Sequence, residues 1–366
     1  MFELTEEQIL IRDSAARFLE EAMPFKRRQE IAGSNDGFDP ELWQSFAEMG
    51  WLGLLVSESA GGLDGSLVDA ALIQQSMARQ LVRSPWLQHG VTAATILSQV
   101  DAPLFLSEQL ASGERIFTVG LFETDDIGDV QTTAIQSDHG FRINGCKRLV
   151  PWAAQADSIL ISVALDGETQ IARVDASGPG ITRRPYRLYD GSRAADVALD
   201  DISIPAEDML GRLSEQGLQR IVDIETALLV SEAAEMMWAI HSQTLEYLKT
   251  REQFGQVLGS FQAIQHRLVD LYVDCELSRS MAEDAIVAVT QPDGAPDTAA
   301  RVAAAKSWTG KTGRRVGKEG IHLHGGIGMT DDIPIGHYFK RLSAISRLNG
   351  NTDWQRHRFS RLNGVG

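Results

Sequence analysis

The chain has 366 residues, with 34 basic and 50 acidic side chains, so its formal net charge is −16. Such an acidic chain is a poor match for a general nucleic-acid binder or for a protein of anionic membrane surfaces, and we expect neither as a partner. The two cysteines, Cys146 and Cys275, lack metal-type spacing, which argues against a zinc site or a disulfide framework and favours a reducing cytoplasm. The length predicts two or three domains, and we expect no signal peptide and no membrane span.

Residues 1–115 are predicted to form a helical domain. The first helix has Thr5 as a candidate N-cap, Gln8 three residues later as in a capping box, and Pro24 as its stop. Two further amphipathic helices are predicted over residues 39–54 and 66–82. The glycine-rich stretch 57–66 predicts a loop between them.

Residues 116–212 change to an alternating pattern that predicts strands. Turns at 138–140 and 166–167 each separate two strands, and residues 194–205 read as a further strand pair. Short strands without intervening helices predict a small antiparallel β-barrel or sandwich.

Residues 213–366 return to long amphipathic helices with breaks that contain Gly or Pro, notably 290–298. Such helices are typical of an antiparallel four-helix bundle. The fold class is therefore α+β, in the order helical domain, β-domain, helical bundle.

Glu225 is unusual within the predicted helix over 220–237. Its neighbours one turn away, Ile221, Val222, Leu228 and Leu229, are all apolar. A carboxylate in an apolar stripe needs a partner, a raised pKa or a chemical task to offset its lost hydration. An arginine partner in the bundle and a place at a domain boundary stay as alternatives. Asp223 has more polar neighbours and is expected to be ordinary.

Two other segments could bind a ligand. Glycines 325, 326 and 328 would let backbone approach a phosphate closely, although a helix cap is an equally good explanation, and a helix precedes them where the dinucleotide fingerprint requires a strand. Arg251 and Phe254 lie where one helix gives way to the next, so a guanidinium beside an aromatic ring could hold a diphosphate and an adjoining ring. An arginine at a helix end is, however, usually just solvated.

Together these pieces resemble the acyl-CoA dehydrogenase family along nearly the whole chain. The stretches that carry the resemblance are "LTEEQILIRD", "LWQSFAEMGWLGLLVSESAGG", "GFRINGCKRLV", "VALDDISIPAEDMLG", "YLKTREQFGQVLGSFQAIQHRLVDL" and "HLHGGIGMTDDIPIGHYFKR". The resemblance implies a tetramer, homomeric or heteromeric, that binds FAD between subunits. It also implies removal of the α-proton of an acyl-CoA by a glutamate and transfer of the β-hydride to flavin N5, with electron-transfer flavoprotein or a similar acceptor downstream.

The resemblance also implies roles for particular residues. Arg251, Phe254 and Gln262 would contact the FAD of a neighbouring subunit, and His322, Gly325 and Gly326 would add contacts, with His322 standing where the family usually has Gln. Glu123 and Asp129 remain from the flavin-binding turn, and Asp353 is also expected at the cofactor.

The catalytic glutamate is not where many family members have it. Asn349 stands in that loop position, and asparagine cannot accept a proton at neutral pH. In isovaleryl-type and some long-chain members the glutamate lies on the helix before the Arg-Phe-Gly segment, and the matching residue here is Glu225.

The flavin-facing half of the site departs from the family pattern. Phe122 and Gly128 replace a Thr and a Ser that would hydrogen-bond the flavin, and Leu149 and Pro151 replace the residues that usually cover it, with Trp152 too far along to substitute.

The leading hypothesis is an FAD-dependent acyl-CoA dehydrogenase with Glu225 as base, acting on a lipid-like or steroid-like acyl-CoA. The alternative is a silent or half-site partner subunit of a heteromeric acyl-CoA dehydrogenase. A flavin monooxygenase or nitroalkane oxidase on the same fold ranks last.

Overall fold

The computed structural model describes residues 3–124, 129–291 and 296–364 and divides into two compact units. The first unit comprises Met1–Arg28, Leu67–Val82 and Thr226–Gly366, and the second comprises Gln29–Ser66 and Arg83–Glu225. The boundary between the units falls within two helices, α2 (Phe25–Gly33) and the long helix α7 (Glu215–Thr250).

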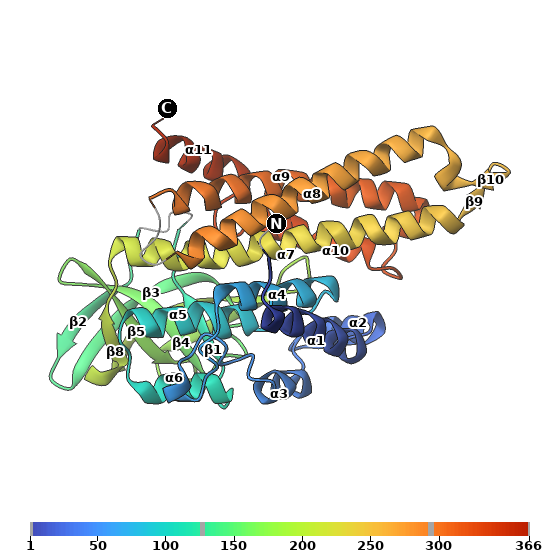
Figure 1. Ribbon diagram of the computed structural model, residues 1–366. Coiled ribbons are helices and arrows are strands. Elements are labelled where there is room, and N and C mark those ends of the chain that lie inside the picture. Colours follow the sequence, from blue (N-terminus) through green and yellow to red (C-terminus); the bar gives the residue numbers. More distant parts are fainter. Residues whose placement is uncertain (1–2, 125–128, 292–295, 365–366) are drawn as a thin grey trace. The chain divides into compact units, whose positions relative to one another are not determined.

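The first unit is built from helices (Figure 1). Besides most of α7, they are α1 (Glu6–Ala22), α4 (Leu67–Arg79), α8 (Gln262–Thr290), α9 (Thr298–His324), α10 (Ile335–Ile345) and α11 (Thr352–Leu362). Helix α1 begins at the predicted capping box, in which the Thr5 side chain accepts from the Gln8 N–H and the Gln8 side chain accepts from the Thr5 N–H. None of the helices in the described part of the chain is both long and apolar enough to cross a bilayer.

Helix α9 organises the C-terminal helices, since α8, α10 and α11 all pack against it. Glycines make the close approach feasible. A Cβ on Gly317 would lie 2.8 Å from the Phe339 ring, and a Cβ on Gly313 would lie 3.1 Å from Leu342. Small residues at a crossing let two helix axes come near each other, which fixes α10 on α9.

The second unit is built around a mixed sheet, which in the described residues has the strand order β6-β7-β3-β2-β4-β5-β8, with β1 paired to β4. The strands are β1 (Phe117–Gly120), β2 (Thr133–Ser137), β3 (Gly140–Pro151), β4 (Ser158–Leu165), β5 (Glu168–Asp175), β6 (Ile181–Arg187), β7 (Arg193–Ile204) and β8 (Met209–Arg212). Most neighbouring strands are antiparallel, as predicted, but β1 and β2 both run parallel to β4. Alternating Val, Ile and Leu side chains from these strands form the core of the unit.

The prediction of a strand pair over residues 194–205 was wrong, because this stretch is the single strand β7, which pairs with β3 on one side and β6 on the other. Asp200 and Asp201 form a bulge within this strand, opposite Asn144. Asp201 has a φ of 52°, its N–H donates to Asn144 Oδ1, and its carboxylate accepts from Arg142. These contacts hold the left-handed residue within a continuous strand.

This unit also contains shorter helices: α3 (Pro40–Glu48), the π-helix η2 (Leu87–Ala93), α5 (Ala94–Gln99) and α6 (Leu104–Ser112). The π-helix contacts β1 through the buried His89. His89 Nδ1 accepts from the Phe117 N–H, so Nε2 carries the proton and donates to the Leu110 carbonyl. Burial lowers the pKa of His89 to about 4, so the ring is neutral and serves as a structural link.

Candidate active site

Glu225 lies on α7 next to buried apolar side chains, among them Ile224 and Leu228, and is itself only partly exposed. Its Oε2 accepts a hydrogen bond of 3.1 Å from the hydroxyl of Thr92, a residue of the π-helix. Sequence analysis did not find Thr92, because hydrophobic periodicity gives no signal for a π-helix. Glu225 is therefore held from a second element and is not simply solvated.

Asp223 differs from expectation, because it is the more buried of the two carboxylates. Only 3% of Asp223 is exposed, and Gln219 Nε2 lies 3.4 Å from its Oδ1. Its more polar neighbours on the same helix were the reason to expect an ordinary carboxylate. Polar side chains can equally supply hydrogen bonds to a buried carboxylate, and the sequence of one helix does not distinguish the two.

The loop that carries Asn349 contacts α7 at Thr226. Asn349 has a φ of 52°, and its Nδ2 donates to Thr226 Oγ1 over 3.3 Å, one residue after Glu225. Its carbonyl accepts from Gln355 Nε2. The Asn349 amide is thus used to fix the loop on the helix.

Lys306 of α9 holds the same loop from the other side. This fully buried ammonium group donates to the carbonyls of Ile345 (2.8 Å) and Gly350 (3.1 Å). Burial lowers the pKa of Lys306 to about 7. The buried Lys306 therefore anchors both ends of this loop through backbone carbonyl groups.

The far end of α7 carries a second group of predicted residues. There the hairpin of β9 (Glu252–Gln253) and β10 (Gln256–Val257) joins α7 to α8 and projects past the ends of both helices (Figure 1). At its tip Phe254 is 87% exposed. Arg251 is also exposed, and within the described residues its side chain makes no hydrogen bond or salt bridge; Gln262, the first residue of α8, is exposed as well.

The predicted glycine turn lies at this same end. Tyr247, one helical turn before Arg251, stacks on His324 with ring centroids 4.5 Å apart, and its hydroxyl donates to the His324 carbonyl. His324 immediately precedes Gly325, which has a φ of 65°. His322 is nearby, and its Nδ1 accepts from Arg267 Nη2 over 2.7 Å, so it belongs to the Arg267–Glu319 ion pair.

Gly325 and Gly326 leave open space where a side chain would stand, because no atom lies within 4 Å of a Cβ built on either residue. Both residues are exposed. Open backbone beside an unpaired guanidinium and an exposed aromatic ring is suited to an extended ligand that carries a diphosphate and a flat ring.

The two groups of residues lie far apart on one helix. From Thr226 to Thr250 there are 24 helical steps, or roughly 36 Å at 1.5 Å per residue. Arg251 therefore cannot contact a reacting centre that lies beside the Thr226 end of the same helix.

Asp353 is not brought to the glycine turn. It lies in the first turn of α11, largely exposed and paired with Arg356, and the preceding carbonyl, that of Thr352, accepts from Ser307 of α9. Ser307 precedes Gly325 by 18 residues along α9, or roughly 27 Å.

Glu123 is engaged in the interior of the second unit. Its carboxylate accepts from the N–H groups of Gln131 and Thr132 and from the ammonium group of Lys147, a fully buried residue of β3. Burial alone would raise the pKa of Glu123, but Lys147 and the Thr132 hydrogen bonds together outweigh it, and the net pKa lies below its usual range. The carboxylate is used within the unit by these partners.

The remaining residues of the predicted flavin-facing half are placed as follows. Gly128 lies outside the described residues. Asp129 accepts from its neighbour Gln131. Leu149 is 40% exposed with a φ of 51°, whereas Trp152 is buried.

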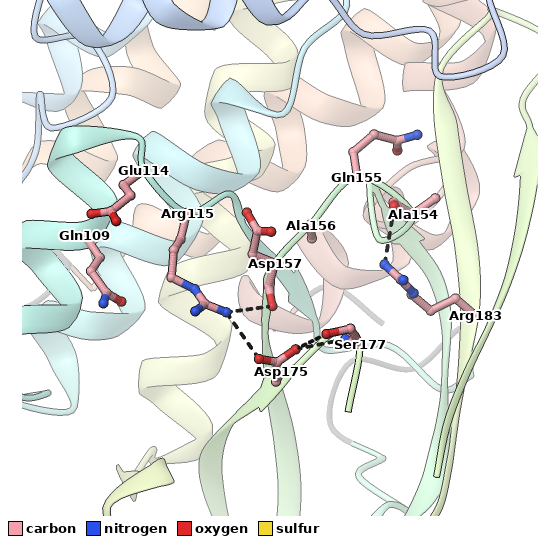
Figure 2. Close-up of a pocket in the computed structure, with 10 residues that line it drawn as sticks. All are labelled: Gln109, Glu114, Arg115, Ala154, Gln155, Ala156, Asp157, Asp175, Ser177 and Arg183. Carbon is pink, nitrogen blue, oxygen red and sulfur yellow. Dashed lines mark hydrogen bonds and ion pairs between the residues drawn. The ribbon is translucent and has the colours of Figure 1, made fainter. Parts of the chain in front are cut away.

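A polar pocket of about 660 Å³ opens in the second unit (Figure 2). Arg115 reaches toward Asp157 and Asp175, and Arg183 donates to the carbonyls of Ala153 and Ala154. The residues that line this pocket carry both signs of charge and include none of the predicted site residues that the structure describes. It is not the predicted site.

Two family models match this chain. "Acyl-CoA dehydrogenase, N-terminal domain" matches residues 5–100, and "Acyl-CoA dehydrogenase, C-terminal domain" matches residues 218–362. The chain belongs to the acyl-CoA dehydrogenase family. Members are flavoenzymes that use FAD and oxidise a CH–CH bond of an acyl-CoA.

Similar family members cover almost the whole chain. Acyl-CoA dehydrogenase IpdE2 of Mycolicibacterium smegmatis is 30% identical and covers 95% of this chain and 96% of its own length. Acyl-CoA dehydrogenase FadE27 of Mycobacterium tuberculosis is 27% identical over 92% of this chain and 91% of its own. A solved variant of the Tcur3481-Tcur3483 steroid ACAD has a TM-score of 0.87 at 29% identity and covers 98% of both chains.

The residues at the hairpin end fit part of an FAD site. The open backbone at Gly325 and Gly326 and the unpaired Arg251 offer donors to a diphosphate, and Phe254 offers an aromatic face. Glu123 does not fit as a direct ligand, because its carboxylate oxygens already accept hydrogen bonds from the chain itself.

Proposed function

We propose that this acyl-CoA dehydrogenase catalyses α,β-dehydrogenation of an acyl-CoA thioester to the trans-2-enoyl-CoA, with Glu225 as the base. The observation that carries the proposal is the contact between Asn349 and Thr226. Asn349 stands at the loop position where the resemblance puts the glutamate of many family members, and Thr226 follows Glu225 directly in the sequence, so this contact supports the proposal. A carboxylate on α7 can therefore serve the region that the loop glutamate serves elsewhere.

The chemistry asked of Glu225 is general base catalysis. The thioester carbonyl makes the α-proton weakly acidic, and a carboxylate held beside apolar side chains is a better acceptor than one in bulk water. When bound, FAD supplies the acceptor for the β-hydride. Glu225 accepts the proton, and the buried side chains of Ile224 and Leu228 next to it reduce the contact of this partly exposed residue with water.

The cofactor is proposed to be shared between subunits. Arg251, Phe254 and Gln262, together with His322, Gly325 and Gly326, would hold the diphosphate and adenine half of a neighbour's FAD. The separation of roughly 36 Å along α7 supports this, because one chain cannot bring Arg251 to its own Glu225 end. Asp353 lies near Ser307, which is roughly 27 Å along α9 from Gly325, so it would contact a different copy of the cofactor from Arg251.

An exposed apolar stripe supports the oligomer. Along α8, Val269, Tyr272, Val273 and Leu277 recur at helical spacing and are all about half exposed. We propose that a second subunit of the same fold covers this stripe in a homo- or heterotetramer, and that an electron-transfer flavoprotein or similar acceptor reoxidises the flavin.

The proposed substrate class is a steroid-like or other bulky lipid acyl-CoA. It rests on the 29% identity with the Tcur3481-Tcur3483 steroid ACAD over nearly the full length of both chains.

The test is the visible spectrum of the purified chain before and after anaerobic addition of a panel of acyl-CoAs. Bleaching of bound flavin by a steroid-side-chain CoA is expected in the wild type and is expected to be lost in Glu225→Gln with flavin content and folding unchanged. Glu246→Gln is the matched control, since this exposed residue of α7 pairs only locally with Lys249. Normal bleaching in Glu225→Gln would defeat the assignment of the base.

The second candidate, a half-site partner subunit, is favoured by the flavin-facing half of the site. Phe122 and Leu149 stand where the family pattern has hydrogen-bonding or covering residues, and Glu123 is already used by Lys147. This candidate expects a colourless isolated chain that gains flavin and activity on co-expression with a paralogue. Full flavin content of the isolated chain would rule it out.

A further inference from the structure

Thr92 occupies a special position between Glu225 and the backbone of its own helix. The residue is 1% exposed, and its Oγ1 lies 3.1 Å from Glu225 Oε2 and 3.2 Å from the Leu87 carbonyl oxygen. A threonine hydroxyl has one proton to donate and two lone pairs that accept. It can therefore donate to only one of these two oxygens at a time.

We infer that Thr92 is the positioning residue for Glu225 and that its hydroxyl satisfies both protonation states of this carboxylate. The inference deepens the proposed function and rests on it. While Glu225 is ionised, the Thr92 hydroxyl donates to Oε2. When Glu225 holds a proton on Oε2, that proton is donated to Thr92 Oγ1, and the Thr92 hydroxyl turns to donate to the Leu87 carbonyl.

The proton and electron balance of the step is simple. The substrate Cα–H bond breaks and an O–H bond forms on Glu225. The electron pair left at Cα becomes the new C=C bond as the Cβ–H pair leaves as hydride to FAD, the oxidant. Thr92 neither gains nor loses a proton, because it only changes its acceptor.

The π-helix supplies the second acceptor. In an α-helix a threonine hydroxyl reaches the carbonyl three or four residues back, as Thr95 does with Val91 over 2.8 Å. Thr92 instead reaches Leu87, five residues back, within the wider turn of η2. The Leu87 carbonyl therefore stays within hydrogen-bond distance of the Thr92 hydroxyl while Oγ1 also contacts Glu225. π-Helical turns are frequent at functional sites, and this one brings a second acceptor to the Thr92 hydroxyl.

The experiment compares Thr92→Val, which keeps the shape and removes the hydroxyl, with Thr92→Ser, which keeps the hydroxyl. Thr95→Val is the matched control, because the Thr95 hydroxyl donates to the carbonyl of Val91, four residues back, and in the described residues makes no hydrogen bond to Glu225. Single-turnover flavin reduction is measured anaerobically with the holoenzyme, using ordinary and α-deuterated acyl-CoA. We expect Thr92→Val to be slower by about 10- to 100-fold with a larger α-deuterium isotope effect, since a charged group loses its hydrogen bond. Thr92→Ser and Thr95→Val should stay close to wild type.

A second readout does not need turnover. In protein labelled with ¹³C at glutamate Cδ, the Glu225 signal is assigned by its absence in Glu225→Gln. We expect this signal to shift in Thr92→Val and to stay in place in Thr95→Val, whether or not the chain carries FAD.

The outcomes separate the two levels of the proposal. Wild-type reduction in Glu225→Gln would defeat the proposed function. An inactive Glu225→Gln with a normal rate and isotope effect in Thr92→Val would overturn only the role of Thr92. Equal losses in Thr92→Val and Thr92→Ser would also overturn it, because the hydroxyl would then not be the group that matters.

Discussion

At the scale of single residues, two lysines are fully buried and are stabilised in different ways. Lys147 faces the Glu123 carboxylate and the Ser162 hydroxyl, so its charge has an opposite charge beside it. Lys306 has the carbonyls of Ile345 and Gly350 as its hydrogen-bond acceptors. Burial lowers the pKa of both lysines; the Glu123 carboxylate opposes this shift at Lys147, whereas the pKa of Lys306 falls to about 7.

This lowered pKa predicts how Lys306 affects stability with pH. The pKa is about 7 in the folded chain against an ordinary 10.5, so between these values the unfolded chain holds a proton that the folded chain lacks. Stability rises with pH wherever the unfolded state binds more protons. The free energy of unfolding of wild type, minus that of Lys306→Met, should therefore grow as pH rises from about 7 toward 10. Urea unfolding of both proteins across this range measures it, and a constant difference would contradict the prediction.

The Lys147–Glu123 pair predicts a large effect at one pH. Lys147→Met should lower the free energy of unfolding by about 3–5 kcal/mol, because the Glu123 charge stays buried without its partner. Lys249→Met, which breaks an exposed pair with Glu246, is the control and should cost at most about 0.5 kcal/mol. Urea unfolding at neutral pH compares them. Similar losses in the two variants would mean that burial of the Glu123 pair has no energetic consequence.

At the scale of elements, sequence predicted those whose signals are local. The capping box at Thr5 and Gln8 and the strands around the 138–140 and 166–167 turns follow from side chains within a few residues. The π-helix and the single strand β7 could not be predicted in this way. The bulge at Asp201 depends on Asn144 and Arg142 of another strand, and the π-helix depends on packing against β1. Contacts between distant segments decide such features.

The β9–β10 hairpin contains a residue in an unfavourable backbone conformation. Its two-residue turn has positive φ at both Phe254 (57°) and Gly255 (81°), a conformation that favours Asn-Gly and disfavours a bulky aromatic. An exposed, strained phenylalanine is explained if its ring contacts a neighbour's FAD.

Phe254→Asn is therefore expected to leave the stability of the apoprotein unchanged or to raise it by up to about 1 kcal/mol. The same variant should retain less FAD after gel filtration, because the aromatic face is gone. Phe254→Tyr keeps the ring and should retain FAD. Thermal unfolding of the apoprotein and the flavin-to-protein ratio are the two measurements. Unchanged flavin retention in Phe254→Asn would remove the reason for the strained residue.

At the scale of the whole molecule, the candidate site could be predicted as a set of residues but not as an arrangement. Glu225 was found by its apolar neighbours, Arg251 by its position beside Phe254 between two helices, and the glycines by their clustering. That Arg251 lies roughly 36 Å along α7 from Thr226 requires the helix to be continuous, which periodicity alone does not establish. The carbonyl partners of Lys306 and the hydroxyl of Thr92 were also beyond prediction, because neither residue type carries a signal for its partner.

This spacing makes a prediction about how subunits share sites. If Arg251 serves a neighbour's site, each site combines Glu225 of one chain with Arg251 of another. Glu225→Gln and Arg251→Ala homo-oligomers should then both be inactive. A mixed oligomer should regain activity, because about half of the sites in each mixed pair would have both wild-type residues. The measurement is substrate-dependent flavin bleaching by oligomers purified through two different tags, one on each variant. No recovery in a properly mixed oligomer would mean that the two residues serve the same site or that the natural neighbour of this chain is a different protein. Co-expression of this chain with its paralogue distinguishes these two explanations. Flavin bleaching only in that heteromeric enzyme would mean that the natural neighbour of this chain is a different protein.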